Sequence, residues 1–117
     1  MAYRSDTCSI ERTSDGVRVG GELDLQAAPA LKQALAELIE DGYIDVVVDM
    51  TDTTFLDSTA LGVLAGRFRE LRAQGGSLAV ICSNRNVLDT LEIAGVGHAL
   101  TLCHSREELT LTPWTAA

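Results

Sequence analysis

Hydrophobic positions along the chain recur with two different periods, in blocks that follow one another. Alternating or continuous apolar runs of a few residues predict β-strands, and apolar residues spaced three and four apart predict amphipathic helices. The expected strands cover residues 8–13, 17–19, 44–50, 77–82 and 99–103. The expected helices cover residues 28–41, 58–73 and 83–94, with a short fourth helix after residue 105. This order predicts an α/β fold, a small mixed, mostly parallel sheet of about five strands with four helices.

The first two strands are expected to form an antiparallel hairpin. Ser14-Asp15-Gly16 lies between them, and Asp-Gly supplies the positive φ that tight hairpin turns need. Gly20–Asp24 is expected to end the hairpin, and residues 1–7 are expected to be loosely ordered. At the other end of the chain, residues 110–117 are expected to form a tail. The prediction is one domain over residues 1–117, with a core from about residue 8 to residue 109.

The run Phe55-Leu56-Asp57-Ser58-Thr59 stands between a strand and a helix. Val46-Val47-Val48 predicts a strand that is buried on both faces and ends at Met50, and residues 51–56 are expected to form a loop. Asp57 is a natural N-cap for the next helix. Ser58 and Thr59 then fall in its first turn, where unpaired N–H groups and the helix dipole favour negative charge. A hydroxyl there can carry a phosphate, although most Asp-Ser-Thr runs before helices are only caps.

In a parallel sheet, every junction from a strand to a helix lies at the carboxyl edge, where open α/β sheets usually bind ligands. Four such junctions are expected, at residues 22–24, 57–59, 83–84 and 104–105. Neighbouring strands lie about 4.8 Å apart, so Asp24 and Ser58 are expected to be neighbours. His98 precedes the last strand and is expected at the opposite edge. Ser105 and Glu108 form a capping-box pattern for the last helix.

Composition and charge exclude several classes of partner. The chain has 9 basic and 17 acidic residues and a net charge of -8, which argues against nucleic acid and anionic membranes as ligands. The sequence contains no apolar run that approaches the length of a membrane span, and a cytoplasmic protein is expected. Cys8, Cys82 and Cys103 are far apart in the sequence, and reduced, mostly buried thiols are expected.

Enzymatic chemistries find little support in the residues. His104 with scattered carboxylates is a poor metal site, and no GxSxG elbow is present for a serine hydrolase. Gly20-Gly21 does not match the dinucleotide fingerprint. Asp49 resembles the phosphoacceptor of a response-regulator receiver, but the chain lacks that site's further carboxylates and its late lysine, so Asp49 is interpreted as a polar residue at a strand end. We therefore expect no catalytic activity, no metal and no cofactor.

The run from Val46 to Leu64, with its Asp-Ser-Thr-x-Leu-Gly motif, resembles the signature of STAS domains, specifically bacterial anti-sigma factor antagonists. Gly21-Glu22-Leu23-Asp24 resembles the Gly-Glu-Leu-Asp segment of that family, and residues 83–95 resemble its third helical segment. The resemblance covers about residues 8–109. Many relatives carry glycine at the position of Ala60, where this chain departs from the family pattern.

The resemblance implies a partner-switching mechanism. The antagonist binds an anti-sigma factor that is itself an ATP-dependent serine kinase, and the sigma factor is released. The kinase then phosphorylates the antagonist on the serine after the aspartate, here Ser58, and a separate phosphatase resets it. By the same resemblance, the partner-binding positions are Asp24, Asp57, Thr59, Leu61 and Gly62.

Three alternatives stay open at this point. Thr59 is a second candidate acceptor of phosphate. The alternative function is that of a STAS scaffold or an accessory subunit of a lipid transporter, in which Ser58 acts only in the cap region. A monomer or a weak dimer is expected, because the free edge of the first hairpin and Trp114 are the features that would support association.

Overall fold

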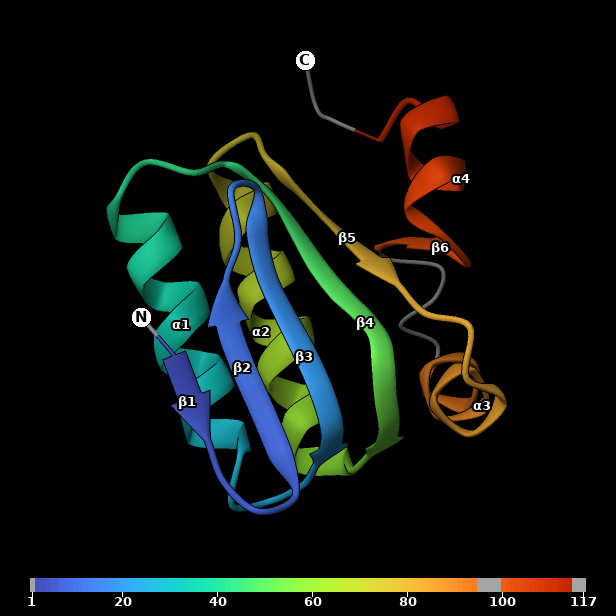
Figure 1. The fold of residues 1–117 in the computed structure, drawn as a ribbon. Coiled ribbons are helices and arrows are strands. Elements are labelled where there is room, and N and C mark those ends of the chain that lie inside the picture. The colour runs from blue at the N-terminus through green and yellow to red at the C-terminus, as the bar shows by residue number, and fades with distance from the viewer. Residues whose placement is uncertain (1, 95–99, 115–117) are drawn as a thin grey trace.

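A computed structural model of the chain describes residues 2–94 and 100–114. It contains one six-stranded sheet in the order β1-β2-β3-β4-β5-β6 (Figure 1). The pairs β1–β2 and β2–β3 are antiparallel, and the remaining pairs are parallel. The strands are β1 (Ala2–Arg4), β2 (Cys8–Arg12), β3 (Gly16–Leu23), β4 (Asp45–Leu56), β5 (Ser77–Ile81) and β6 (Thr101–Cys103). The helices are α1 (Ala28–Glu40), α2 (Ser58–Ala73), α3 (Arg85–Ile93) and α4 (Arg106–Leu111).

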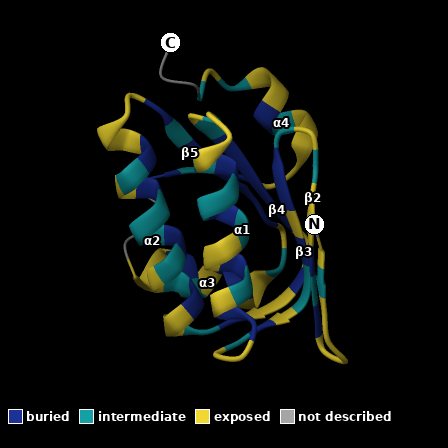
Figure 2. Cartoon of the chain, turned by 90° about the vertical axis from the view of Figure 1, so that its left-hand side faces the viewer, coloured by how far each residue is buried: buried dark blue, intermediate teal, exposed yellow. Residues whose placement is uncertain are grey.

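The two faces of the sheet carry separate hydrophobic clusters. The larger cluster lies under α1, α2 and α3, and α1 and α2 pack side by side (Figure 2). A smaller cluster joins α4 to the other face, and its members are Val47, Ala79, Ile81, Cys103 and Leu109, with Trp114 packed against them. Val46, Val47 and Val48 are at most 1% exposed, which confirms the prediction of a central strand buried on both faces.

The structure corrects the prediction that residues 51–56 form a loop. β4 continues through these residues to Leu56, paired with β3 from Gly20 to Leu23 through two register shifts. Within β4, only Asp45–Asp49 pair with β5, so the later part of β4 has a strand on one side alone. Thr51, Asp52 and Thr54 in this part are exposed, and the register shifts interrupt the alternation, which is why the sequence resembles a loop. Thr53 is buried, and its hydroxyl donates to the carbonyl of Val19 at 2.8 Å.

The N-terminal prediction was also wrong. Residues Ala2–Arg4 form the edge strand β1, which pairs with β2 and covers the edge of the first hairpin. β3 is longer than expected, because it runs from Gly16 to Leu23 and does not end at Val19. The sheet therefore has six strands where about five were expected, and the mixed, mostly parallel α/β architecture with four helices is confirmed.

The C-terminal helix extends into the segment that was predicted to be a tail. α4 ends at Leu111, and Trp114 is partly buried against the smaller cluster. The predicted break at residues 95–97, His98 and the predicted strand start at Ala99 lie outside the described residues.

Candidate functional site

The site is built where β3 and β4 end beside each other. Leu23 and Leu56 are paired in register and buried, and the N–H of Asp57 donates to the carbonyl of Leu23 over 3.2 Å. Asp24 and Asp57 are the next residues of these two strands, so the first two predicted junctions adjoin, as expected. In Figure 1, both strands end close to the start of α2.

Asp57 begins α2 as its N-cap, which confirms the prediction. Its backbone is extended, with φ -95° and ψ 174°, and one carboxylate oxygen accepts the N–H of Ala60 at 3.0 Å. Its carbonyl accepts the N–H of Leu61, also at 3.0 Å. The N–H groups of Ser58 and Thr59 precede the first intrahelical donor, so they face outward with the positive end of the helix dipole.

Asp24 has a similar local role at the turn before α1. Its Oδ1 accepts the N–H groups of Gln26 at 3.0 Å and Ala27 at 3.1 Å, and its carbonyl accepts from Ala27 and Ala28. One oxygen of each aspartate, Asp24 and Asp57, is therefore occupied by the chain's own backbone. Both carboxylates are fixed in place by the loops that they stabilise.

The first residues of α2 divide into an exposed group and a buried group. Ser58, Thr59 and Gly62 are exposed, whereas Leu61 is partly buried against the larger cluster. Ala60 is fully buried, so its methyl group points into the core and not toward the surface on which Ser58 lies. The departure from glycine at Ala60 therefore leaves the approach to Ser58 open.

The other two junctions do not join this site, contrary to the expectation of one common edge. β5 ends at Ile81, which pairs with Asp49, and β6 ends at Cys103, which pairs with Ile81. The whole stretch Met50–Leu56 of β4 separates that level of the sheet from Asp57. His104 instead forms a local pair with Glu108, with 3.3 Å between Nδ1 and Oε2.

The capping box of α4 forms with one difference from the predicted pattern. The hydroxyl of Ser105 accepts the N–H of Glu108 at 3.1 Å, as expected. The Glu108 carboxylate accepts the N–H of His104 at 2.9 Å, one residue before the expected donor. The N–H of His104 and, to a smaller extent, its imidazole lower the pKa of Glu108 below its ordinary value, although burial opposes them.

The sequence suggested that Asp49 lies at a strand end, and the structure corrects this. It lies inside β4 with 6% of its surface exposed. Its carboxylate accepts from the hydroxyl of Thr51 at 2.6 Å and from Arg106 at 3.4 Å, and Arg106 also binds Asp15 at 2.9 Å. Burial opposes the ionisation of Asp49, but these donors outweigh it and lower the pKa of the carboxyl group. Asp49 thus anchors α4 to the sheet.

Cysteine and metal chemistry find no support in the described part of the chain. Cys8, Cys82 and Cys103 are buried and unpaired, and burial raises the pKa of each thiol, so none is poised as a thiolate. Among residues 2–94 and 100–114, no group of three or more His, Cys, Asp or Glu side chains is arranged to hold a metal ion. None of the helices in these ranges is long and apolar enough to cross a membrane.

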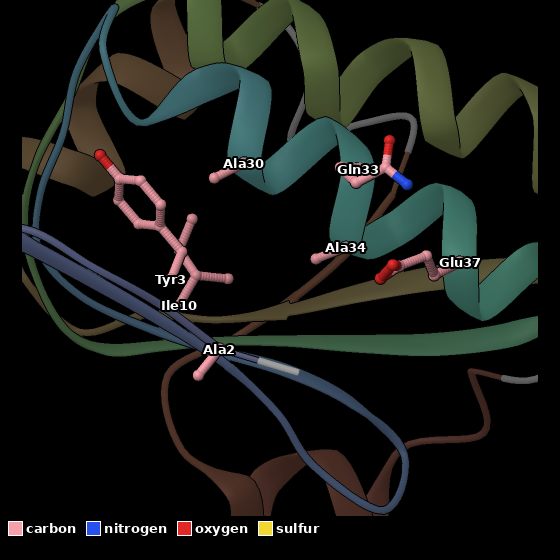
Figure 3. Close-up of a pocket in the computed structure, with 7 residues that line it drawn as sticks. All are labelled: Ala2, Tyr3, Ile10, Ala30, Gln33, Ala34 and Glu37. Atoms are coloured by element: carbon pink, nitrogen blue, oxygen red, sulfur yellow. The ribbon is translucent and has the colours of Figure 1, made fainter.

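A hollow lies away from the site, between the β1–β2 edge and α1 (Figure 3). Tyr3, Ile10, Ala30 and Ala34 form its mostly apolar walls, and its volume is about 220 Å³. It contains none of the residues at the ends of β3 and β4.

Two exposed apolar side chains at the site were not predicted as contact residues from the sequence. Leu25, directly after Asp24, is 65% exposed, and Phe55, two residues before Asp57, is 45% exposed. The available signal was their position, because each is a large apolar residue next to a predicted strand-to-helix junction. Of the two neighbouring apolar residues, Leu56 is the one that is buried in the core. The outward direction of Phe55 could not be predicted, because it depends on the shifted register between β3 and β4.

Comparison with known proteins defines the class. The STAS domain family model matches residues 10–109, and the chain belongs to this family. It is 35% identical to the anti-sigma-B factor antagonist of Bacillus subtilis over 80 residues, which are 68% of this chain and 72% of that protein.

Solved structures agree with this fold. The chain matches the crystal structure of an anti-sigma factor antagonist from Mycobacterium paratuberculosis with a TM-score of 0.74 and 26% identity, over 95% of this chain and 90% of the other. It also matches the phosphorylated form of the Bacillus cell fate determinant SpoIIAA, with a TM-score of 0.64 and 23% identity, over 87% and 96% of the two chains. The second match supports the fold alone.

Proposed function

We propose that this chain is an anti-sigma factor antagonist that is switched by phosphorylation of Ser58. In its unmodified form it binds an anti-sigma factor that is an ATP-dependent serine kinase, and the sigma factor is released. The kinase phosphorylates Ser58, the complex dissociates, and a serine phosphatase restores the active form. The chain acts as a binding module and not as an enzyme.

One observation carries this proposal: an exposed serine at the first position of a helix, next to a fixed acidic cap. The side chain of Ser58 is exposed directly after Asp57, in a chain that is similar to named anti-sigma-B factor antagonists. A phosphate on Ser58 would meet the unpaired N–H groups and the positive end of the α2 dipole, which the fold tolerates. It would also add about -1.5 to -2 charges beside Asp24 and Asp57, which would alter a partner surface.

The partner surface in this proposal includes the positions suggested by the family pattern. Thr59 and Gly62 are exposed on α2, and Asp24, Asp57 and Leu61 are partly exposed around Ser58. The capping bonds of Asp24 and Asp57 leave one oxygen of each carboxylate for a partner's donors. Asp24, Asp57 and Leu61 would accordingly serve both as scaffold and as contact surface, and Thr59 and Gly62 as contact surface.

A phosphorylation assay tests the proposal. The anti-sigma factor kinases of the organism that encodes this chain are purified and incubated one by one with the chain and ATP. The intact mass of the chain is then measured. We expect one kinase to add a single phosphate to the wild type and to Thr59→Ala, but none to Ser58→Ala. A phosphate that persists on Ser58→Ala, or the absence of modification by every kinase, would contradict the proposal.

A further inference from the structure

The two exposed apolar side chains at the site, Leu25 and Phe55, lie near the ends of the two strands that build it. Leu25 follows the end of β3, and Phe55 lies near the end of β4, immediately before Leu56 and Asp57. The main-chain bond from Asp57 to Leu23 joins the two segments. Both residues therefore occupy the same edge of the sheet as Ser58.

Phe55 points away from the core. In a strand, successive side chains alternate between faces. Leu56 and its register partner Leu23 are buried in the larger cluster, whereas Phe55 and its partner Glu22 are exposed. The ring of Phe55 thus lies on the face of the sheet opposite α1 and α2, at its carboxyl edge.

The fold gives no reason for this exposure. Single exposed apolar residues are common on protein surfaces. The other large apolar side chains with high exposure lie at separate places in the fold: Ile44 precedes β4, Ile93 ends α3 and Leu111 ends α4. Leu25 and Phe55 instead lie near the ends of two paired strands, and the loops there are held by the hydrogen bonds of Asp24 and Asp57.

The charged residues on the two segments that carry this pair are acidic, while Lys32 and Arg67 lie farther along α1 and α2, where they line a hollow with Thr59 and Gly62. The two segments that build the edge, residues 19–31 and 50–66, contain no lysine or arginine. Glu22, Asp24 and Asp57 are exposed or partly exposed beside the apolar pair. An apolar centre with a polar rim is the usual anatomy of a protein interface, and here the rim is acidic.

We propose that Leu25 and Phe55 are the apolar anchors by which the chain binds the kinase. The kinase surface that receives them is an apolar pocket with a basic rim. This inference rests on the proposed function and adds the residues that supply most of the binding energy. Ser58 lies at the same edge of the sheet, directly after the N-cap Asp57. Binding the phosphorylated chain would bury a dianion against an apolar pocket, and the cost of removing its hydration favours dissociation.

The test measures the dissociation constants of the wild type and of its variants for the kinase that binds the wild type. Surface plasmon resonance is used, without ATP hydrolysis. Leu25→Ser and Phe55→Ser are each expected to weaken binding about tenfold or more, mainly through faster dissociation. Glu22→Gln is expected to slow association and to reduce its dependence on salt. Phe55→Tyr is expected to retain affinity near that of the wild type, because it keeps the ring.

Leu111→Ser is the matched control. Leu111 is 81% exposed at the end of α4, and Figure 1 shows α4 far from the end of the sheet where β3 and β4 terminate. This variant is expected to bind like the wild type, and unfolding midpoints verify that all variants are folded. If Leu25→Ser and Phe55→Ser bind within about twofold of the wild type, or if Leu111→Ser loses as much affinity, the inference is overturned. If the wild type binds no kinase, the proposed function itself fails.

Discussion

At the scale of single residues, Asp57 combines a structural role with a proposed contact role, and substitutions can separate them. Asp57→Ala removes the acceptor for the N–H of Ala60, and loss of such a cap costs about 0.5–2 kcal/mol of unfolding free energy. Asp57→Asn keeps an acceptor at the same place. We therefore expect urea unfolding to show a lower midpoint for Asp57→Ala than for Asp57→Asn. Equal midpoints would show that the cap contributes nothing measurable.

Glycines provide a second test at this scale, because their structural roles differ. An added Cβ at Gly66 meets nothing within 4 Å, so Gly66→Ala should stabilise α2 by about 0.5–1 kcal/mol. A Cβ at Gly16 would lie 1.8 Å from the carbonyl oxygen of Val47, so Gly16→Ala should be strongly destabilising. Thermal unfolding of both variants measures the two effects. A loss of stability in Gly66→Ala would contradict the open environment of this helix face.

At the scale of elements, the attachment of α4 depends on an ionised Asp49. Its folded-state pKa is lowered, so its contribution to stability is present above the ordinary carboxyl pKa and is lost as the pH falls through the lowered value. Hydrogen bonds to a charged group contribute about 1.5–3 kcal/mol, which is the expected cost of Asp49→Asn at neutral pH. The difference in stability between wild type and Asp49→Asn should shrink at acidic pH.

Trp114 offers a local readout of the same element. It is the single tryptophan of the chain and packs against the cluster beneath α4. At neutral pH, the fluorescence of Asp49→Asn is expected to shift toward that of a more exposed indole, as the anchor of α4 weakens. An unchanged spectrum together with unchanged stability would show that Arg106 holds α4 through Asp15 alone.

The elements also show how far the sequence determines the fold and the site. Apolar periodicity located the central strands and the first three helices, and capping residues located α4 and the start of α2, because burial and local hydrogen bonds leave direct traces in sequence. The extension of β4 to Leu56 left no such trace, since it depends on pairing with β3 through shifted register. The same non-local pairing determines that β5 and β6 end at the level of Asp49 and not beside Asp57.

At the scale of the whole molecule, we expect phosphorylation of Ser58 to leave the fold intact. A negative group at a helix N-terminus is favourable by about 0.3–1 kcal/mol, and the nearby carboxylates offset part of this gain. The thermal midpoint of the phosphorylated chain should therefore stay within about 4 °C of the unmodified one, with an unchanged circular dichroism spectrum. A much lower midpoint would indicate that the switch acts by unfolding the chain and not by changing its surface.

The central claim is that one phosphate on Ser58 releases the kinase from an otherwise unchanged molecule. It is tested most directly by the dissociation constant of the kinase complex, measured for the unmodified chain and for the chain phosphorylated on Ser58. We predict that the phosphorylated chain binds about a hundredfold or more weakly, a difference of about 2.7 kcal/mol. Equal dissociation constants for the two forms would contradict the account.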